Sequence, residues 1–210
     1  MRTLYDFELS AECYRVRLLL GFLGLKYEIV PVDIFPGTDH NAPWFRAINP
    51  LGTLPVLADA GANLASSLEI LGYLARQYDG TRHWYPPEAA SEIDAFLTTA
   101  GQLDDTAGAA RLVLNFEQGD DLARAQADAH LLLRRLDEHL WFGERAGRDW
   151  LCAPAHPTLA DLACFPPIVL SEEGGVSRQD YPAIRRWLDR FKRISGFLPM
   201  SGVFPTAPAK

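Results

Sequence analysis

NPLGTLPVLADAGANLASSLE, residues 49–69, is the stretch that decides the fold of this chain. Two short apolar segments, 54–58 and 63–65, are separated by the turn-forming pair AG at 60–61, which predicts an antiparallel hairpin. The sequence SSLE at 66–69 then matches the S-x-x-E capping box that begins many helices. The stretch therefore predicts two paired strands followed directly by a helix.

The segments upstream of the hairpin predict a β-α-β unit. Residues 3–7 and 27–32 have strand patterns, and 11–23 between them carries apolar residues at helical spacing until Gly24 ends it. Such a unit pairs its strands in parallel through a right-handed crossover. With a short helical turn at 44–47, the expected order is β-α-β-α-β-β-α.

The segments downstream of the hairpin have no strand patterns and are mainly helical in pattern. Residues 81–87 end in two consecutive prolines, which cannot continue a helix, so we expect a linker there. Helical patterns follow, over residues 88–107, 121–141, 159–170 and 182–194. We therefore expect an α+β domain over 1–80, a linker over 81–87 and an all-α domain over 88–210.

Composition excludes several classes of function. Twenty Lys and Arg against 27 Asp and Glu give a net charge of −7, which argues against a nucleic-acid or anionic-membrane partner. The densest basic stretch, 185–193, alternates with apolar residues and is typical of the exposed face of an amphipathic helix. The three cysteines form no C-x-x-C pair and the histidines lack metal-ligand spacing, so we expect no metal site. No stretch has transmembrane length, and we expect a cytoplasmic protein.

Four segments in the same order resemble those of cytosolic glutathione transferases. They are the segment 49–57, PTLADL at 157–162, YPAI at 181–184 and FLPM at 197–200, and together they span nearly the whole chain. The start SAECYRVR at 10–17 is similar to bacterial members related to the zeta class. The resemblance implies a thioredoxin-like N-terminal domain that binds glutathione as co-substrate, an all-helical C-terminal domain, a homodimer and a role in detoxification.

Ser10 is the candidate catalytic residue. It lies where the first strand passes into the first helix, a position whose unpaired N–H groups and helix dipole favour an anion such as a thiolate. The resemblance implies that its hydroxyl stabilises the sulfur of bound glutathione. A plain helix cap remains an alternative for Ser10. Cys13, in the first helical turn, and Tyr5, on the strand, remain rival thiol-activating groups.

The remaining candidate glutathione-binding residues are assigned by the resemblance. Leu54 precedes Pro55 at the family's cis-proline, where the backbone of Leu54 would bind the cysteinyl part of glutathione. Ser67 would hold the γ-glutamyl carboxylate at a helix N-terminus. Ser66 stands where relatives usually carry an acidic residue or Gln, so a charge partner for the glutathione amino group is missing. His40 would donate to the glycine carboxylate.

The resemblance further implies conjugation of glutathione to a small hydrophobic electrophile. We expect the second-substrate pocket to involve Phe7, Leu9, residues near 102–111 and Phe204. Glutathione-dependent isomerisation or dehalogenation is the enzymatic alternative, and a non-catalytic binding protein with the same fold is the other. Separately, TLAD at 158–161 resembles a buried capping box whose role is in folding.

Overall fold

The computed structural model describes residues 1–203, and it divides into two compact units, Met1–Gly80 and a second that begins at Thr81. Each unit is described by itself. Within the described residues, every helix is too short or too polar to cross a membrane.

The first unit has the predicted order of strands and helices. Its elements are β1 (Arg2–Asp6), α1 (Ala11–Phe22), β2 (Tyr27–Pro31), the 3-10 turn η1 (Asp39–Asn41), α2 (Pro43–Ile48), β3 (Val56–Asp59), β4 (Ala62–Leu64) and α3 (Ser67–Tyr78). The sheet order is β2-β1-β3-β4, with β1 parallel to β2 and the other two pairs antiparallel. The thioredoxin-like architecture is thus confirmed.

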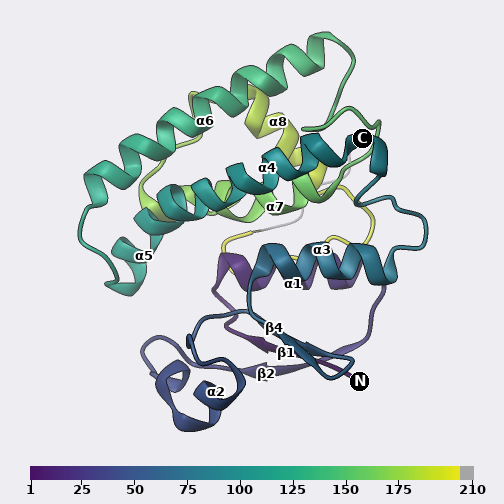
Figure 1. Ribbon diagram of the computed structural model, residues 1–210. Coiled ribbons are helices and arrows are strands. Elements are labelled where there is room, and N and C mark those ends of the chain that lie inside the picture. The colour runs from purple at the N-terminus through teal and green to yellow at the C-terminus, as the bar shows by residue number, and fades with distance from the viewer. Residues whose placement is uncertain (204–210) are drawn as a thin grey trace. The chain divides into compact units, whose positions relative to one another are not determined.

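Both faces of this sheet are covered by helices. Alternation along paired strands separates the Leu4–Leu57 pair from the Tyr5–Val56 pair, which faces the opposite side. Val56 packs with Phe45 of α2, and Tyr5 is partly buried against the same cluster. The helices α1 and α3 lie side by side on the other face (Figure 1). Apolar side chains on alternating strand positions therefore hold one layer of helix on each side.

One strand boundary and one helix cap differ from the expectation. The strand predicted at 54–58 begins at Val56, because the Leu54–Pro55 peptide is cis and proline has no N–H for the ladder. The capping box predicted at 66–69 is only half formed. Ser66 Oγ accepts from the Glu69 N–H at 3.5 Å, whereas the reciprocal bond from the Glu69 side chain is not found among the described residues.

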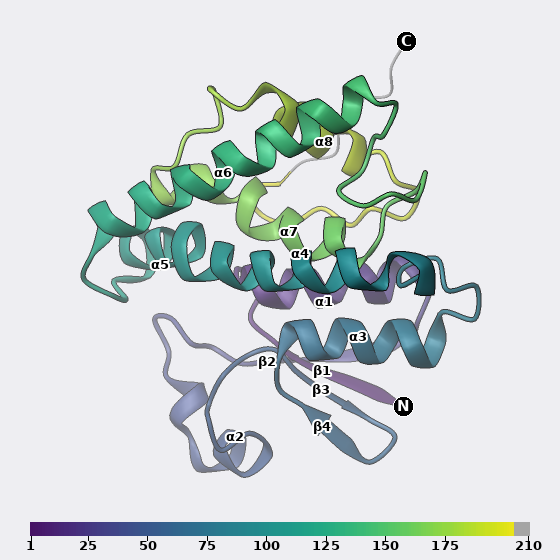
Figure 2. The same ribbon diagram turned by 45° about the horizontal axis from the view of Figure 1, so that its top comes forward.

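The second unit is helical, as predicted. Its elements are η2 (Pro87–Ala89), α4 (Ala90–Leu103), the π-helical turn η3 (Asp104–Gly108), α5 (Ala109–Phe116), α6 (Leu122–Arg145), α7 (Leu159–Val169), η4 (Ser171–Gly174) and α8 (Pro182–Phe191). Residues of α7 are buried along its whole length, so this helix is the centre of the unit's core. It packs mainly against α4, and α6 runs back beside α5 (Figure 2).

The helix predicted to end at 107 continues instead to Phe116. Gly108 keeps a right-handed helical conformation, with φ −63°, and the wider turn η3 passes the chain on into α5. The continuation ends where Glu117 adopts φ 53°. Helix-forming Ala and Leu residues after Gly108 outweigh the cost of the glycine.

The buried capping box of α7 is present and is extended by a neighbouring helix. Thr158 Oγ1 accepts from the Ala160 N–H, and the Asp161 carboxylate accepts from the Thr158 N–H at 2.9 Å. Asp161 also accepts from the Leu151 N–H and from Trp187 Nε1, both at 2.9 Å. One buried carboxylate therefore joins the start of α7 to a loop and to α8.

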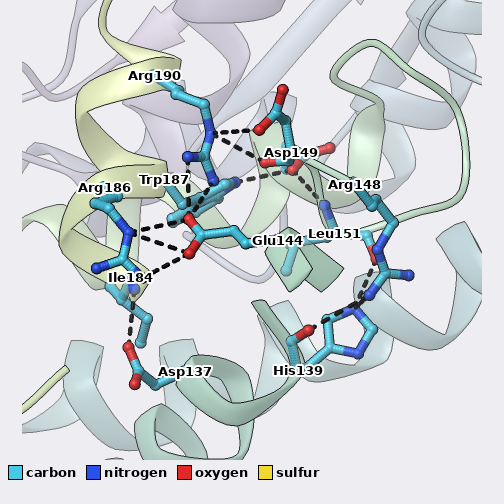
Figure 3. A network of polar contacts seen from close by, with 11 residues as sticks. Asp137, His139, Glu144, Arg148, Asp149, Leu151, Ile184, Arg186, Trp187 and Arg190 are labelled. Carbon is cyan, nitrogen blue, oxygen red and sulfur yellow. Dashed lines mark hydrogen bonds and ion pairs between the residues drawn. The ribbon is translucent and has the colours of Figure 1, made fainter. Parts of the chain in front are cut away.

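A second polar network joins α6 to α8 at the surface (Figure 3). Glu144 accepts from Arg186 at 2.5 Å and from Arg190 at 3.0 Å. About two turns earlier on α6, Asp137 accepts from the Ile184 N–H and so caps the first turn of α8. Two of the arginines in the basic stretch 185–193 are thus used structurally.

Candidate functional site

The sequence-predicted site residues of the first unit lie at one edge of its sheet. The register pairs Asp6 with Pro31 and Tyr5 with Val56, so the ends of β1 and β2 and the start of β3 meet there. The pair Leu57–Leu64 brings the end of β4 to the same edge. Ser10 follows β1, His40 follows β2, Leu54–Pro55 precedes β3 and Ser66–Ser67 follows β4.

Ser10 is the N-cap of α1. Its backbone is extended, with φ −75° and ψ 126°, and its Oγ accepts from the Cys13 N–H at 3.2 Å. The side chain is half-buried. Since the oxygen accepts from the helix, the hydroxyl proton can be donated to an anion in front of the first turn, where the helix dipole also favours negative charge. The cap and the predicted catalytic contact are therefore compatible.

The two rivals of Ser10 are placed in less suitable surroundings. Cys13 is fully buried, and burial, followed by the charge of Asp6, raises the pKa of its thiol to about 12. The Phe7 N–H and the Ser10 hydroxyl lower that pKa, but burial outweighs them. Tyr5 packs against Phe45 as a partly buried ring.

Ser67 is backed by a buried guanidinium. Ser67 is the first residue of α3 and is 3% exposed, while Arg15 of α1 is 0% exposed. Arg15 Nη1 donates to Ser67 Oγ at 2.8 Å. The oxygen of Ser67 is thereby occupied as an acceptor, and its proton is left to donate to a ligand. Together with the helix N-terminus, this makes the start of α3 suited to a carboxylate.

His40 is held in a defined tautomer by its neighbours. Asn41 accepts from Arg46 Nη2 through Oδ1 at 2.7 Å, so its amide nitrogen faces His40 Nε2 at 3.0 Å. Nε2 is then the acceptor, and a neutral ring carries its proton on Nδ1. Among the described residues, buried Nδ1 has no hydrogen-bond partner. A buried donor without a partner is costly, and a ligand carboxylate would satisfy it.

The segment before β3 is fitted closely to the His40 loop. Asn49 Nδ2 donates to the Thr53 carbonyl at 2.8 Å, and Asn49 Oδ1 accepts from the Leu51 N–H. Gly52 has φ +63°, and a Cβ there would lie 2.7 Å from the His40 carbonyl oxygen. The half-buried Leu54 follows, and its backbone makes no hydrogen bond to another part of the described chain. Its N–H and C=O are therefore available to an extended peptide.

Arg17 fixes the turn that carries Ser10. Its Nη1 lies 2.6 Å from both carboxylate oxygens of Asp6, at the end of β1, and its Nη2 donates to the Glu8 carbonyl at 2.7 Å. Burial raises the pKa of Asp6, and Arg17 lowers it. The Arg17 guanidinium thus joins α1 to Asp6 at the end of β1 and to Glu8 in the loop before Ser10.

Sequence reasoning missed three arginines that support this edge, Arg15, Arg17 and Arg46. A signal was available for Arg15, which shares a helix face with Leu18 and Leu19 and so sits on the apolar side of α1. Helical spacing offers no such signal for Arg17, whose partners Asp6 and Glu8 lie 11 and 9 positions away. It offers none for Arg46 either, which binds the Pro50 carbonyl and Asn41 Oδ1 just outside α2.

The remaining candidate residues are distributed over both units. Phe7 and Leu9 are half-buried in the first unit, residues 102–111 belong to the second, and Phe204 lies outside the described residues. In residues 1–203, no group of three or more His, Cys, Asp or Glu side chains could hold a metal ion. Ser10, His40, Leu54 and Ser67 thus all belong to the first unit, whereas the residues expected around a second substrate do not all lie in it.

Comparison with known proteins gives the same picture. A family model described as the N-terminal domain of glutathione S-transferase matches residues 4–82. A maleylacetoacetate isomerase of Pseudomonas aeruginosa is 30% identical over 206 residues, which cover 89% of each chain. The maleylacetoacetate isomerase of Rhizobium meliloti is 46% identical over 78 residues, 37% of this chain and 36% of that protein. A crystal structure of a possible glutathione S-transferase from Rhodopseudomonas palustris matches with a TM-score of 0.84 and 28% identity, covering 95% of this chain and 97% of that one.

Proposed function

The chain belongs to the glutathione S-transferase family and is a zeta-like transferase, and from this premise we propose that it uses Ser10 to activate the thiol of glutathione for attack on a small hydrophobic electrophile. The observation that carries the proposal is the pair of serine-bearing helix N-termini, Ser10 of α1 and Ser67 of α3, at one edge of one sheet.

The thiol chemistry needs a larger thiolate fraction at neutral pH. A hydroxyl that donates to the charged form and a helix N-terminus both lower the pKa of a thiol, whose ordinary value is about 8.5. The Ser10 hydroxyl supplies the first effect and the N-terminus of α1 the second, and Ser10 itself does not become a nucleophile. The glutathione sulfur then forms the new bond to the electrophilic carbon, and the displaced group leaves with its electron pair. Orientation of the two reactants supplies the remaining acceleration.

We assign the other parts of glutathione to residues of the site by their charge and hydrogen-bonding groups. The γ-glutamyl carboxylate binds Ser67, backed by Arg15, and the glycine carboxylate binds Nδ1 of His40. The backbone of Leu54, before Pro55, pairs with the cysteinyl residue. Ser66 offers the amino group a neutral oxygen at most, and that oxygen already accepts from the Glu69 N–H. We therefore expect an affinity set mainly by the two carboxylates.

A calorimetric titration with reduced glutathione tests the proposal. Wild-type protein should bind saturably, and Ser67→Ala should weaken binding about tenfold, the effect of losing one hydrogen bond to a charged group. Ser91→Ala, an exposed serine of α4, serves as the matched control and should bind like wild type. Ser10→Ala should bind with similar affinity but raise the pKa of the bound thiol. Absence of binding at millimolar glutathione would overturn the proposal.

A second candidate is isomerisation of an activated alkene by reversible addition of the same thiolate. Both relatives described above are named maleylacetoacetate isomerase, and this favours the candidate. The two reactions differ in their products. An isomerase returns glutathione unchanged after each turnover, whereas a conjugating enzyme consumes it, so following free thiol during turnover distinguishes them.

The assembly and location follow from the family and are proposals of the same kind. We expect residues 1–80 to be the glutathione-binding domain, 81–87 a linker and 88–210 the helical domain of a cytoplasmic homodimer. Size-exclusion chromatography with light scattering measures the assembly, and a mass of one 23.4 kDa chain would contradict the dimer.

A further inference from the structure

A pocket of about 550 Å³ lies beside α8 in the second unit, outside the candidate glutathione site. Arg185, Leu188 and Lys192 line it from one face of α8, at positions i, i+3 and i+7. Arg178 and Gln179, which precede the helix, also line it. Three cationic side chains from two parts of the chain thus face one space.

Arg178 is held in place by the end of α7. Its Nη1 donates to the carbonyl of Ile168 at 2.9 Å and to that of Val169, and its Nη2 lies 3.1 Å from Glu172. The Arg178 guanidinium therefore caps the C-terminal end of α7. Two carboxylates, Glu172 and Asp189, also line the pocket, and the pairing with Arg178 neutralises the charge of Glu172. The position of the positive charge is set by the fold.

Arg185 and Lys192 are not held by such contacts. Within residues 1–203, neither side chain makes a hydrogen bond or lies within ion-pair distance of a carboxylate. Their neighbours Arg186 and Arg190, on the other side of α8, both bind Glu144 (Figure 3). The basic stretch is therefore divided between a structural side and a side that faces the pocket.

The cations in the pocket are crowded. Burial lowers the pKa of Lys192 and the charge of Arg178 lowers it further, while Asp189 and Glu172 oppose the change. Burial likewise lowers the pKa of Arg178, with Arg185 acting in the same direction. Three cations and two carboxylates leave the lining at +1, in a chain whose net charge is −7. A bound anion would relieve this local repulsion.

We propose that the pocket formed by Arg178, Arg185 and Lys192 is a binding site for a small molecule that carries a phosphate group. A phosphate offers several acceptor oxygens, enough for the fork of Arg185, the ammonium of Lys192 and the amide of Gln179 at once. Leu188 provides an apolar floor, 4% exposed, for the rest of the molecule. The site is independent of glutathione and takes a different ligand.

Inorganic pyrophosphate is the probe, titrated calorimetrically into the whole chain in a phosphate-free buffer of low ionic strength. The wild type should bind one equivalent saturably. Arg185→Gln and Lys192→Gln should each weaken binding about tenfold, because each removes a charge-assisted hydrogen bond. Asp189→Asn should strengthen it, since a carboxylate in the lining repels the ligand. Both cations are at least partly exposed, so the variants should fold.

Arg193→Gln is the matched control, because Arg193 is exposed next to Lys192 and does not line the pocket. It should leave the affinity within about twofold of the wild type. Lack of saturation up to about 10 mM pyrophosphate would overturn the proposal. Equal weakening by Arg193→Gln and Lys192→Gln would also overturn it, because it would mean diffuse attraction to the basic helix instead of a site. Unchanged binding in Arg185→Gln and Lys192→Gln would have the same meaning.

Discussion

Arg15 shows how a single buried side chain prepares a ligand contact. A guanidinium that donates to Ser67 Oγ occupies this hydroxyl as an acceptor and leaves its proton to be donated. The charge remains behind the hydroxyl and adds to the potential of the α3 N-terminus. The contact proposed for the γ-glutamyl carboxylate therefore depends on two residues that lie 52 positions apart in the sequence.

Substitution of Arg15 tests this dependence. Arg15→Lys should weaken glutathione binding about tenfold, because a lysine cannot reproduce the guanidinium geometry. The loss should disappear for an analogue of glutathione that lacks the γ-glutamyl carboxylate. Calorimetry with both ligands measures the difference, and Arg76→Lys, an exposed position on α3, is the control. Equal losses for the two ligands would mean that Arg15 only supports the fold.

The cysteines should not react with thiol reagents in the native protein. Cys13, Cys152 and Cys164 are all buried, and burial raises the pKa of Cys13 and of Cys152 to about 12. At neutral pH roughly one thiol in 10⁵ with such a pKa is ionised, and the thiolate is the reactive form. A thiol reagent should therefore detect three thiols only after unfolding.

Cys13→Ala should leave turnover within about threefold of the wild type if Ser10 activates glutathione. Steady-state kinetics of Cys13→Ala and Ser10→Ala, measured side by side, decides between the two residues. Loss of turnover in the cysteine variant alone would reverse the assignment.

Helix α7 is held by one carboxylate. Asp161 accepts three N–H groups from Thr158, Leu151 and Trp187 in a fully buried position. Asp161→Asn keeps the shape but turns one acceptor into a donor that faces these N–H groups, so we expect a loss of about 2–4 kcal/mol in the free energy of unfolding. Trp187→Phe removes one donor in a comparison variant. Urea unfolding gives both values, and a loss below about 1 kcal/mol in Asp161→Asn would contradict the assigned role.

The α6–α8 network should depend on pH. Burial tends to raise the pKa of Glu144, but hydrogen bonds from Arg186 and Arg190 outweigh it, and the pKa is lowered. Because the folded-state pKa lies below the unfolded one, the stabilisation is present above the unfolded-state pKa and disappears as the pH falls through the folded-state value. Glu144→Gln should cost about 1 kcal/mol at neutral pH and little in acid.

Unfolding of the wild type and Glu144→Gln at both pH values measures this change. Glu138→Gln, an exposed carboxylate of the same helix, should show no such pH-dependent difference. A constant deficit in Glu144→Gln at all pH values would indicate lost packing and not a lost ion pair.

The chain as a whole divides into two compact units, and glutathione should affect their stability differently. The residues assigned to the thiol and its two carboxylates all belong to Met1–Gly80. A ligand at about 100 times its Kd adds about 2.7 kcal/mol to the stability of the structure it binds. Hydrogen exchange with and without glutathione should therefore show the larger gain in protection in residues 1–80. Equal gains in residues 81–203 would mean that the two units unfold together.

The sequence predicts the order of the elements better than their ends. Hairpin spacing and the S-x-x-E signal at Ser66 were sufficient for the first unit, because both are local. The extension of α4 through η3 into α5 was missed, because nothing local distinguishes the helical Gly108 from a glycine that ends a helix. The candidate site follows the same rule. Ser10 and Ser67 belong to local helix signals, whereas Arg15 and Arg17 act through partners that only the folded chain brings near.

Gly52 is a position at which few substitutions can be tolerated. Gly24 and Gly61 also have positive φ, but the space around each is open, so Asn, which tolerates this conformation, is an affordable replacement at either position. At Gly52 the conformation and the close approach to the His40 carbonyl act together, and any side chain meets the backbone that carries the neighbouring histidine. We therefore expect glycine at position 52 to be retained when other residues of the His40 loop change.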